Sequence, residues 1–306
     1  MTYSLAIHGG AGTILKSLMT PEREAAFHAG LARALMAGEE VLRDGGLALD
    51  AVVASVSVLE DDPLFNAGRG AVFTSNGEQE MDAAVMEGQT RKAGAVAGVC
   101  GPRNPVQLAR AIMQRTEHVM LIGPNALDIA RAEGLALEDK HYFFTQTRWD
   151  ALQETLKLRA EGKEPDDPAR RHGTVGAVAR DVRGTLAAAT STGGMTAKAP
   201  GRVGDTPVIG AGTFADNDTC AVSCTGHGEV FIRWNAAAEI AARMRYAHET
   251  LQQAADHIVH TVLAPNDGSG GLVAIDRDGN VTMPFNSPGM YRGVVSSQAK
   301  AETFIF

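Results

Sequence analysis

The chain has 306 residues, of which 44% are hydrophobic, enough for one large buried core or two smaller ones. Its formal net charge of -8 offers no electrostatic attraction to nucleic acid or to an anionic membrane surface, so neither partner is expected. The first residues do not resemble a signal peptide, and no apolar run approaches the ~18 residues of a membrane span. We therefore expect a cytoplasmic protein.

The first 60 residues predict a strand followed by two helices. A short apolar strand is expected over residues 5–8, before a loop rich in glycine. Thr20 is a good N-cap and Pro21 suits the first position of a helix, which the glycines from Gly45 onwards should end. A second helix over 47–59 is apolar on nearly all sides, so we expect it to be buried.

The next hundred residues predict one hairpin and several helices. Residues 72–75 and 80–85 have strand character and flank Asn76-Gly77, which is a strong hairpin turn signal. Three further helices are expected over residues 104–114, 124–134 and 148–160.

Residues 161–171 contain no large apolar side chain and are predicted to form a linker. Strand patterns dominate after it. Hairpins are expected over 175–179 with 185–189 and over 272–275 with 281–285, further strands over 221–224 and 229–232, and helices over 235–246 and 249–263. Strands and helices are grouped rather than alternating, which favours an α+β fold with sheets covered by helices.

The linker leads directly into His172-Gly173-Thr174, at the start of an apolar strand. A threonine hydroxyl is a weak nucleophile until a base removes its proton, and a free α-amine on the same residue is such a base. Thr174 has a free amine only if the Gly173–Thr174 bond is cut. The pattern alone leaves open that Thr174 is an ordinary β-branched strand residue.

Glycine-rich loops after this strand supply the other groups that acyl transfer needs. Thr192 and Thr225 carry hydroxyls, and the glycines around them expose N–H groups for an oxyanion. Arg202 and Asp205, three residues apart, match the carboxylate and ammonium of an amino-acid head group. A simple surface ion pair is the alternative for these two residues.

Taken together, the motifs resemble the plant-type L-asparaginase / isoaspartyl aminopeptidase family of N-terminal nucleophile (Ntn) hydrolases. The resemblance covers nearly the whole chain and rests on an ordered series of motifs: Ile7-His8-Gly9-Gly10-Ala11-Gly12, Pro63-Leu64-Phe65-Asn66-Ala67-Gly68, Met81-Asp82-Ala83, Ala93–Val99, His172–Ala177, the threonine and glycine loops above, Gly270–Asp276 and Gly289-Met290-Tyr291-Arg292.

The resemblance implies one Ntn-hydrolase domain over residues 1–306, folded as a four-layer αββα sandwich. Self-cleavage between Gly173 and Thr174 would give an α chain of residues 1–173, whose tail is the linker of about 161–173, and a β chain of residues 174–306. The active species would be a dimer of these αβ heterodimers.

The resemblance also implies roles for single residues. Thr174 is similar to the family's nucleophile and base, Thr192 to the threonine that supports it, and Thr225 and Gly226 to the oxyanion hole. Substrate binding is implied for Arg202, Asp205, the backbone at Gly228, and Asn66 near the scissile bond. A structural sodium ion would bind backbone carbonyls of Leu59, Glu60, Asp62, Phe65, Ala67 and Arg69.

The implied activity is release of L-aspartate from isoaspartyl dipeptides and from L-asparagine, with no cofactor for the chemistry. Small molecules and dipeptides would be the substrates. Two alternatives are a glycosylasparaginase-like hydrolase and an uncleaved protein that binds a ligand without catalysis. The cleavage point argues against the first alternative: this chain has Gly173-Thr174, whereas glycosylasparaginase-like hydrolases have an Asp-Thr pair there.

Overall fold

The computed structural model describes residues 2–163 and 173–306, so most of the predicted linker lies outside the described residues. The strands are β1 (Ser4–Gly12), β2 (Met81–Glu87), β3 (Ala93–Val99), β4 (Met120–Ile122), β5 (Val175–Arg180), β6 (Leu186–Thr192), β7 (Thr213–Ala215), β8 (Cys220–Gly226), β9 (Gly270–Asp276), β10 (Val281–Thr282), β11 (Gly289–Ser296) and β12 (Ala299–Phe304). The α-helices are α1 (Pro21–Arg43), α2 (Ala48–Asp61), α3 (Pro105–Arg115), α4 (Leu127–Ala132), α5 (Lys140–Phe143), α6 (Gln146–Ala160), α7 (Gly228–Trp234), α8 (Ala236–Tyr246) and α9 (Leu251–Asp256), which continues as a π-helix over His257–Leu263. Short 3-10 turns cover Lys16–Leu18, Gly68–Gly70, Gly123–Ala126 and Ala264–Asn266.

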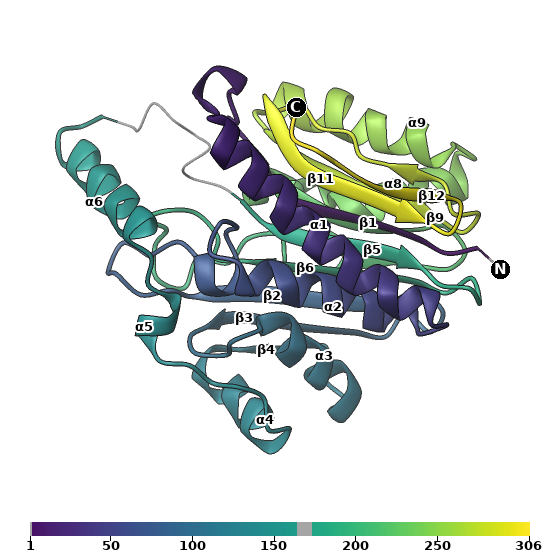
Figure 1. Cartoon of the computed structure of the whole chain (residues 1–306), viewed down its shortest axis with the longest axis horizontal. Coiled ribbons are helices and arrows are strands. Elements are labelled where there is room, and N and C mark those ends of the chain that lie inside the picture. The colour runs from purple at the N-terminus through teal and green to yellow at the C-terminus, as the bar shows by residue number, and fades with distance from the viewer. Residues whose placement is uncertain (1, 164–172) are drawn as a thin grey trace.

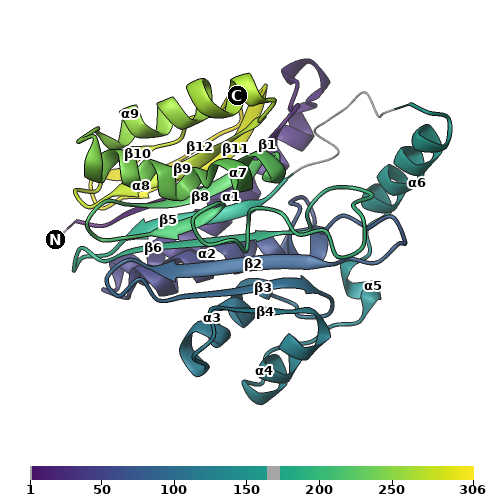
Figure 2. The same ribbon diagram turned by 180° about the vertical axis from the view of Figure 1, so that it is seen from behind.

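Two stacked sheets and two helical layers form the molecule (Figure 1). The larger sheet has eight strands in the order β12-β11-β1-β5-β6-β2-β3-β4, and the smaller has four in the order β10-β9-β8-β7. Helices α1, α2 and α3 cover the outer face of the larger sheet, while α8 and α9 cover the smaller one (Figure 2). This arrangement confirms the predicted α+β sandwich of four layers.

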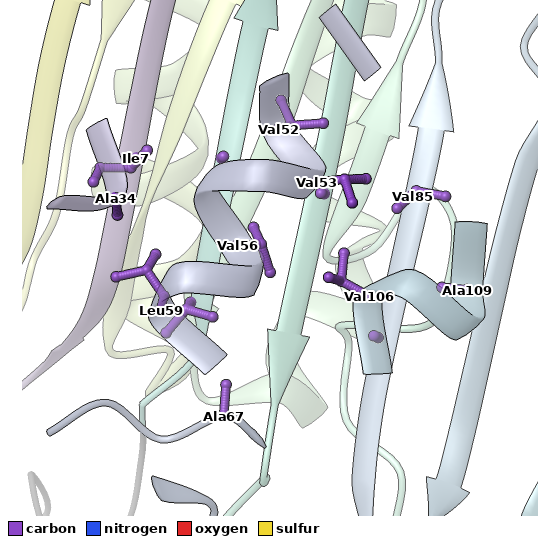
Figure 3. Packing of buried hydrophobic residues seen from close by; sticks show 14 of the residues in the cluster. Ile7, Ala34, Val52, Val53, Val56, Leu59, Ala67, Val85, Val106 and Ala109 are labelled. Carbon is purple, nitrogen blue, oxygen red and sulfur yellow. The ribbon is translucent and has the colours of Figure 1, made fainter. Parts of the chain in front are cut away.

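The first two helices form as their sequence predicts. The Thr20 side chain accepts a hydrogen bond from the N–H of Arg23 at 3.3 Å, which caps α1. Helix α2 packs beside α1 and over β5 and β6 at the centre of the larger sheet, and Val52, Val53 and Val56 project from it into the core (Figure 3). Within the described residues no helix is long and apolar enough to cross a membrane.

The two sheets meet through strands made largely of small residues. Strand β5 reads Val-Gly-Ala-Val-Ala and β6 reads Leu-Ala-Ala-Ala-Thr, and nearly all of these residues are fully buried. Because their side chains are short, the strands of the smaller sheet can pack directly over them. Strand β5 lies fourth in the eight-stranded sheet, so its first residue is enclosed on all sides.

Two sequence predictions about single elements are wrong. Asn76-Gly77 does form a turn, but residues 72–75 make only one bridge, from Thr74 to Lys198. Strand β2 pairs instead with β3 and β6, because a fully buried strand needs neighbours on both edges. Residues 229–232 belong to helix α7 and not to a strand. A run of only four residues is too short for its periodicity to distinguish a helix from a strand.

Candidate active site

Thr174 lies immediately before β5 and is buried. Its Oγ1 donates a hydrogen bond to Oγ1 of Thr192 at 3.1 Å. Thr192 ends β6, and the antiparallel register that pairs Val175 with Ser191 brings the two threonines together. Thr192 Oγ1 donates in turn to the carbonyl oxygen of Gly173 at 2.9 Å. One threonine therefore contacts both the hydroxyl of Thr174 and the carbonyl that this hydroxyl would attack.

Asn66, in the loop after α2, supplies a second donor to the same carbonyl. Its Nδ2 donates to the Gly173 oxygen at 2.8 Å and to the Gly194 oxygen at 2.7 Å. The backbone oxygen of Asn66 accepts from Gly193 N–H at 3.0 Å, which ties the loop to the end of β6. The Gly173 carbonyl thus accepts hydrogen bonds from Asn66 and Thr192, an arrangement that stabilises negative charge on a carbonyl oxygen.

A series of buried side-chain hydrogen bonds begins at the backbone carbonyl of Thr174. His8 Nδ1 lies 2.9 Å from the Thr174 carbonyl oxygen, and His8 Nε2 lies 2.9 Å from Ser223 Oγ. Because the carbonyl only accepts, Nδ1 carries the proton and Nε2 accepts from Ser223. Contacts of 2.7 Å extend the series through Thr190 to Thr213. Burial lowers the pKa of His8 to about 3, so the ring is neutral near pH 7.

The predicted head-group residues come together, with one partner that the sequence analysis missed. Arg202 does not pair with Asp205. Its Nε and Nη2 donate to the two carboxylate oxygens of Glu229 at 2.9 and 2.7 Å. A Cβ added to Gly228 would lie 2.8 Å from Asp205 Oδ1 and 3.1 Å from Arg202 Nη2, so glycine lets the backbone approach both charged groups.

Asp205 is the most perturbed carboxyl group of the pocket. It is 4% exposed, and its Oδ2 has no hydrogen-bond partner among the described residues. Burial raises the pKa of Asp205 to about 7, against a smaller lowering by its own backbone N–H and by Arg202. A buried carboxyl with a free oxygen is prepared to accept from a cationic ligand.

Thr225 and Gly226 end strand β8 beside these loops. Thr225 is fully buried, and its Oγ1 accepts from the N–H of Ala11 at 3.2 Å. Within the described part of the chain its own hydroxyl proton has no acceptor, so it is available to an oxyanion. Gly226 has φ +149° and packs against Gly270, where a Cβ would meet the Gly270 Cα at 2.7 Å.

The nucleophile and the head-group residues line one small pocket. Its walls include Thr174, Thr192, Arg202 and Asp205, and its volume is about 10 Å³, room for about one water molecule. Gly173 closes one side of it. Gly173 is also the only described residue shared with a second cavity of about 1030 Å³.

The loop over residues 59–69 fits the predicted sodium ion in its chemistry. Gly68, with φ +52°, curls the chain so closely that a Cβ there would lie 2.4 Å from the Glu60 carbonyl oxygen. At Gly70 a Cβ would lie 2.0 Å from the Phe65 carbonyl oxygen. The Arg69 guanidinium lies 5.5 Å from the ring centroid of Tyr142, so its charge is engaged outside the loop. Backbone carbonyl oxygens are suitable ligands for a hard cation, and the tight curl of the loop is compatible with such a site.

Sequence reasoning missed three residues that position the site: His8, Ser223 and Glu229. His8 lies in the motif Ile7–Gly12, and Ser223 and Glu229 flank the loop that contains Thr225. Nothing in these segments indicated which residues they contact. Glu229 directly follows Gly228, a predicted substrate-binding residue. That position could have indicated that its carboxylate lies near the substrate. The pairing of His8 with Ser223 spans 215 residues and depends on sheet stacking.

Comparison with known proteins identifies the family of this chain. The family model described as Asparaginase matches residues 1–305. The chain is 50% identical over 295 residues to a protein named isoaspartyl peptidase from Salmonella typhimurium, covering 94% of this chain and 93% of the relative. It is 40% identical over 291 residues to the human isoaspartyl peptidase/L-asparaginase, covering 94% and 91%. This chain therefore belongs to the asparaginase family that the model describes.

Proposed function

We propose that this protein cleaves its own Gly173–Thr174 bond and then hydrolyses isoaspartyl dipeptides and L-asparagine. The observation that carries the proposal is the arrangement around Thr192. The Thr174 hydroxyl lies beside it, and the Gly173 carbonyl accepts from both Thr192 and Asn66. These two donors would stabilise the oxyanion that forms when Thr174 Oγ1 attacks Gly173.

As the Gly173–Thr174 amide bond breaks, Gly173 becomes esterified to Thr174 Oγ1 and the hydroxyl proton ends on the Thr174 nitrogen; water then hydrolyses this ester. The free α-amine of Thr174 then serves as the base for its own hydroxyl. The hydroxyl oxygen attacks the β-carbonyl of the substrate, and the Thr225 hydroxyl and the Gly226 N–H stabilise the resulting oxyanion. The α-amine returns the proton to the leaving nitrogen, so that ammonia or an amino acid departs. Water then hydrolyses the aspartyl ester on Thr174 and releases L-aspartate.

Recognition of the aspartyl head would fall to the pocket beyond Thr174. Arg202 binds the α-carboxylate with the guanidinium nitrogens that Glu229 does not fully occupy. Asp205 and the Gly228 backbone accept the α-ammonium. The pocket volume of about 10 Å³ is too small for this head while Gly173 forms its wall, so release of the α-chain end would also open the site.

Three further features belong to the proposal. The loop over 59–69 would hold a structural sodium ion through the carbonyls of Leu59, Glu60, Asp62, Phe65, Ala67 and Arg69. The active assembly would be a dimer of αβ heterodimers. The protein would act in the cytoplasm.

Steady-state kinetics with L-asparagine and β-aspartyl-leucine test the proposal. The wild-type protein should release L-aspartate from both substrates. Thr225→Ala should fold normally and lose about 10²–10³ in kcat, because it removes one oxyanion donor. Arg202→Ala should mainly raise KM for both substrates. Near-normal turnover by Thr225→Ala would contradict the assigned oxyanion hole.

A further inference from the structure

The large cavity next to Gly173 has no role in the mechanism above. Its lining includes residues near the beginning of α1 and near the beginning of α6. Helix α6 projects from one side of the molecule (Figure 1). Its volume of about 1030 Å³ is at the upper end of the range for small-molecule sites. Asn66 and the glycine loop 9–12 form the wall next to the scissile bond. The cavity therefore opens at the bond that Thr174 attacks.

Two arginines line this cavity without a carboxylate partner. Arg148 donates to the carbonyl oxygens of Gly70 at 2.9 Å and Leu64 at 3.4 Å, and no ion pair joins it to a described carboxylate. Arg23 is exposed and lies over the ring of Phe27 at 5.7 Å, also without an ion pair in the described chain.

The two guanidinium groups act on one another. Burial, together with a smaller effect of the charge on Arg23, lowers the pKa of Arg148 to about 10. Tyr291 lies against the same pair, stacked on Phe27 with ring centroids 4.0 Å apart. Its hydroxyl has no hydrogen-bond partner among the described residues. Two cations and the Tyr291 side chain therefore line the same cavity.

Acidic groups of the cavity lie elsewhere on its wall. Asp150 and Glu154 belong to α6, and Asp150 accepts a hydrogen bond from Gln146 at 2.8 Å. Among the described residues Arg148 donates only to carbonyl oxygens, so the end of the cavity that it forms with Arg23 favours an anion.

We infer that this cavity binds the leaving group of the substrate, and that Arg23 and Arg148 bind the α-carboxylate of a leaving amino acid. The inference rests on the proposed function. If Arg202 and Asp205 hold the aspartyl head on one side of Thr174, the leaving nitrogen must point away from that pocket. The cavity that shares only Gly173 with it is the space on that other side. Ammonia from asparagine has no carboxylate and gains nothing from these arginines.

The test compares three substrates that share the aspartyl head: β-aspartyl-leucine, its C-terminal amide, and L-asparagine. For the wild-type protein we expect kcat/KM to be about tenfold higher for the acid than for the amide, the effect of one charge-assisted hydrogen bond. Arg23→Gln should lower kcat/KM for the acid about fivefold or more and leave the amide and asparagine within about twofold. Because Arg23 is exposed, this variant should fold.

Arg43→Gln is the matched control, since Arg43 is an exposed arginine in the last turn of the same helix. It should leave all three rates unchanged. Equal wild-type rates for the acid and the amide, or an equal loss on all three substrates in Arg23→Gln, would overturn the inference while leaving the proposed function intact. Failure of the wild-type protein to hydrolyse any of the three would instead contradict the proposed function, and the inference with it.

Discussion

At the scale of single residues, Asp205 shows how the site is prepared for its ligand. Its carboxyl group is buried with one unpartnered oxygen, and burial raises its pKa to about 7. An α-ammonium placed against it would favour the ionised form and return the pKa towards its ordinary value. Binding of an aspartyl head should therefore expel a proton from Asp205.

Calorimetry in buffers of different ionisation enthalpy measures this proton directly. With L-aspartate as ligand, we expect release of close to one proton at pH 6, where Asp205 is mostly protonated in the free protein. The number should decline towards zero above pH 8, where the group is already ionised. Binding without proton release at pH 6 would show that Asp205 does not receive the ammonium.

His8 gives a second prediction at this scale, about stability. Its pKa is lowered to about 3 in the folded protein, against an ordinary value near 6.5, so the unfolded chain binds more protons between these values. The free energy of unfolding should therefore fall as the pH drops from about 6.5, by up to about 1.4 kcal/mol per pH unit.

Denaturant unfolding at pH 7, 6 and 5 tests this in the Thr174→Ala background, which should keep a single chain. His8→Gln in that background should be less stable at pH 7, because it breaks the contacts to Thr174 and Ser223, but should show a shallower dependence on pH. An unchanged pH slope in His8→Gln would assign the effect to another group.

At the scale of elements, β5 depends on the absence of a side chain at Gly176. A Cβ there would lie 1.9 Å from Ser223 Oγ and 2.5 Å from His8 Nε2. The gap therefore houses the hydrogen bond between His8 Nε2 and Ser223 Oγ, which orients the ring whose Nδ1 bonds to the carbonyl of Thr174. Only glycine at this position lets β5 pack against the hydrogen-bonded side chains of His8 and Ser223.

Gly176→Ala should destabilise the protein by about 1–3 kcal/mol, as overpacking of a close-packed interior does, and should slow self-cleavage. Unfolding midpoints and the time course of chain cleavage measure the two effects. Adding Ser223→Ala removes the nearer clash, so the double variant should recover part of the stability. If Gly176→Ala behaves like the wild-type protein, the packing described for β5 is wrong.

The same scale shows where sequence patterns succeed. Helices α1 and α2 were predicted correctly because their signals are local, a Thr20 cap for α1 and a long apolar run for α2. The hairpin of β5 and β6 was also predicted, since its turn and its strands are adjacent in sequence. The partner of β2 and the helical state of α7 were predicted wrongly, because burial in the finished fold decides both. Five strands, β3, β4, β7, β11 and β12, were not predicted.

At the scale of the whole molecule, the site exists because two sheets bring distant segments together. Asn66 reaches Gly173 across 107 residues, and Glu229 reaches Arg202 across 27. The types of residue at the site could be predicted from the motifs, and family membership was confirmed by comparison. Partners such as His8 with Ser223 could not, because no local pattern records which strands stack.

The central claim is that Thr174 becomes a nucleophile by cutting the chain in front of itself. Intact-mass spectrometry of the purified wild-type protein and of Thr174→Ala tests this most directly. We predict two wild-type fragments that divide between Gly173 and Thr174, and a single 32.1 kDa chain for Thr174→Ala. An intact wild-type chain that still hydrolyses β-aspartyl-leucine, or a cut at any other bond, would contradict the account.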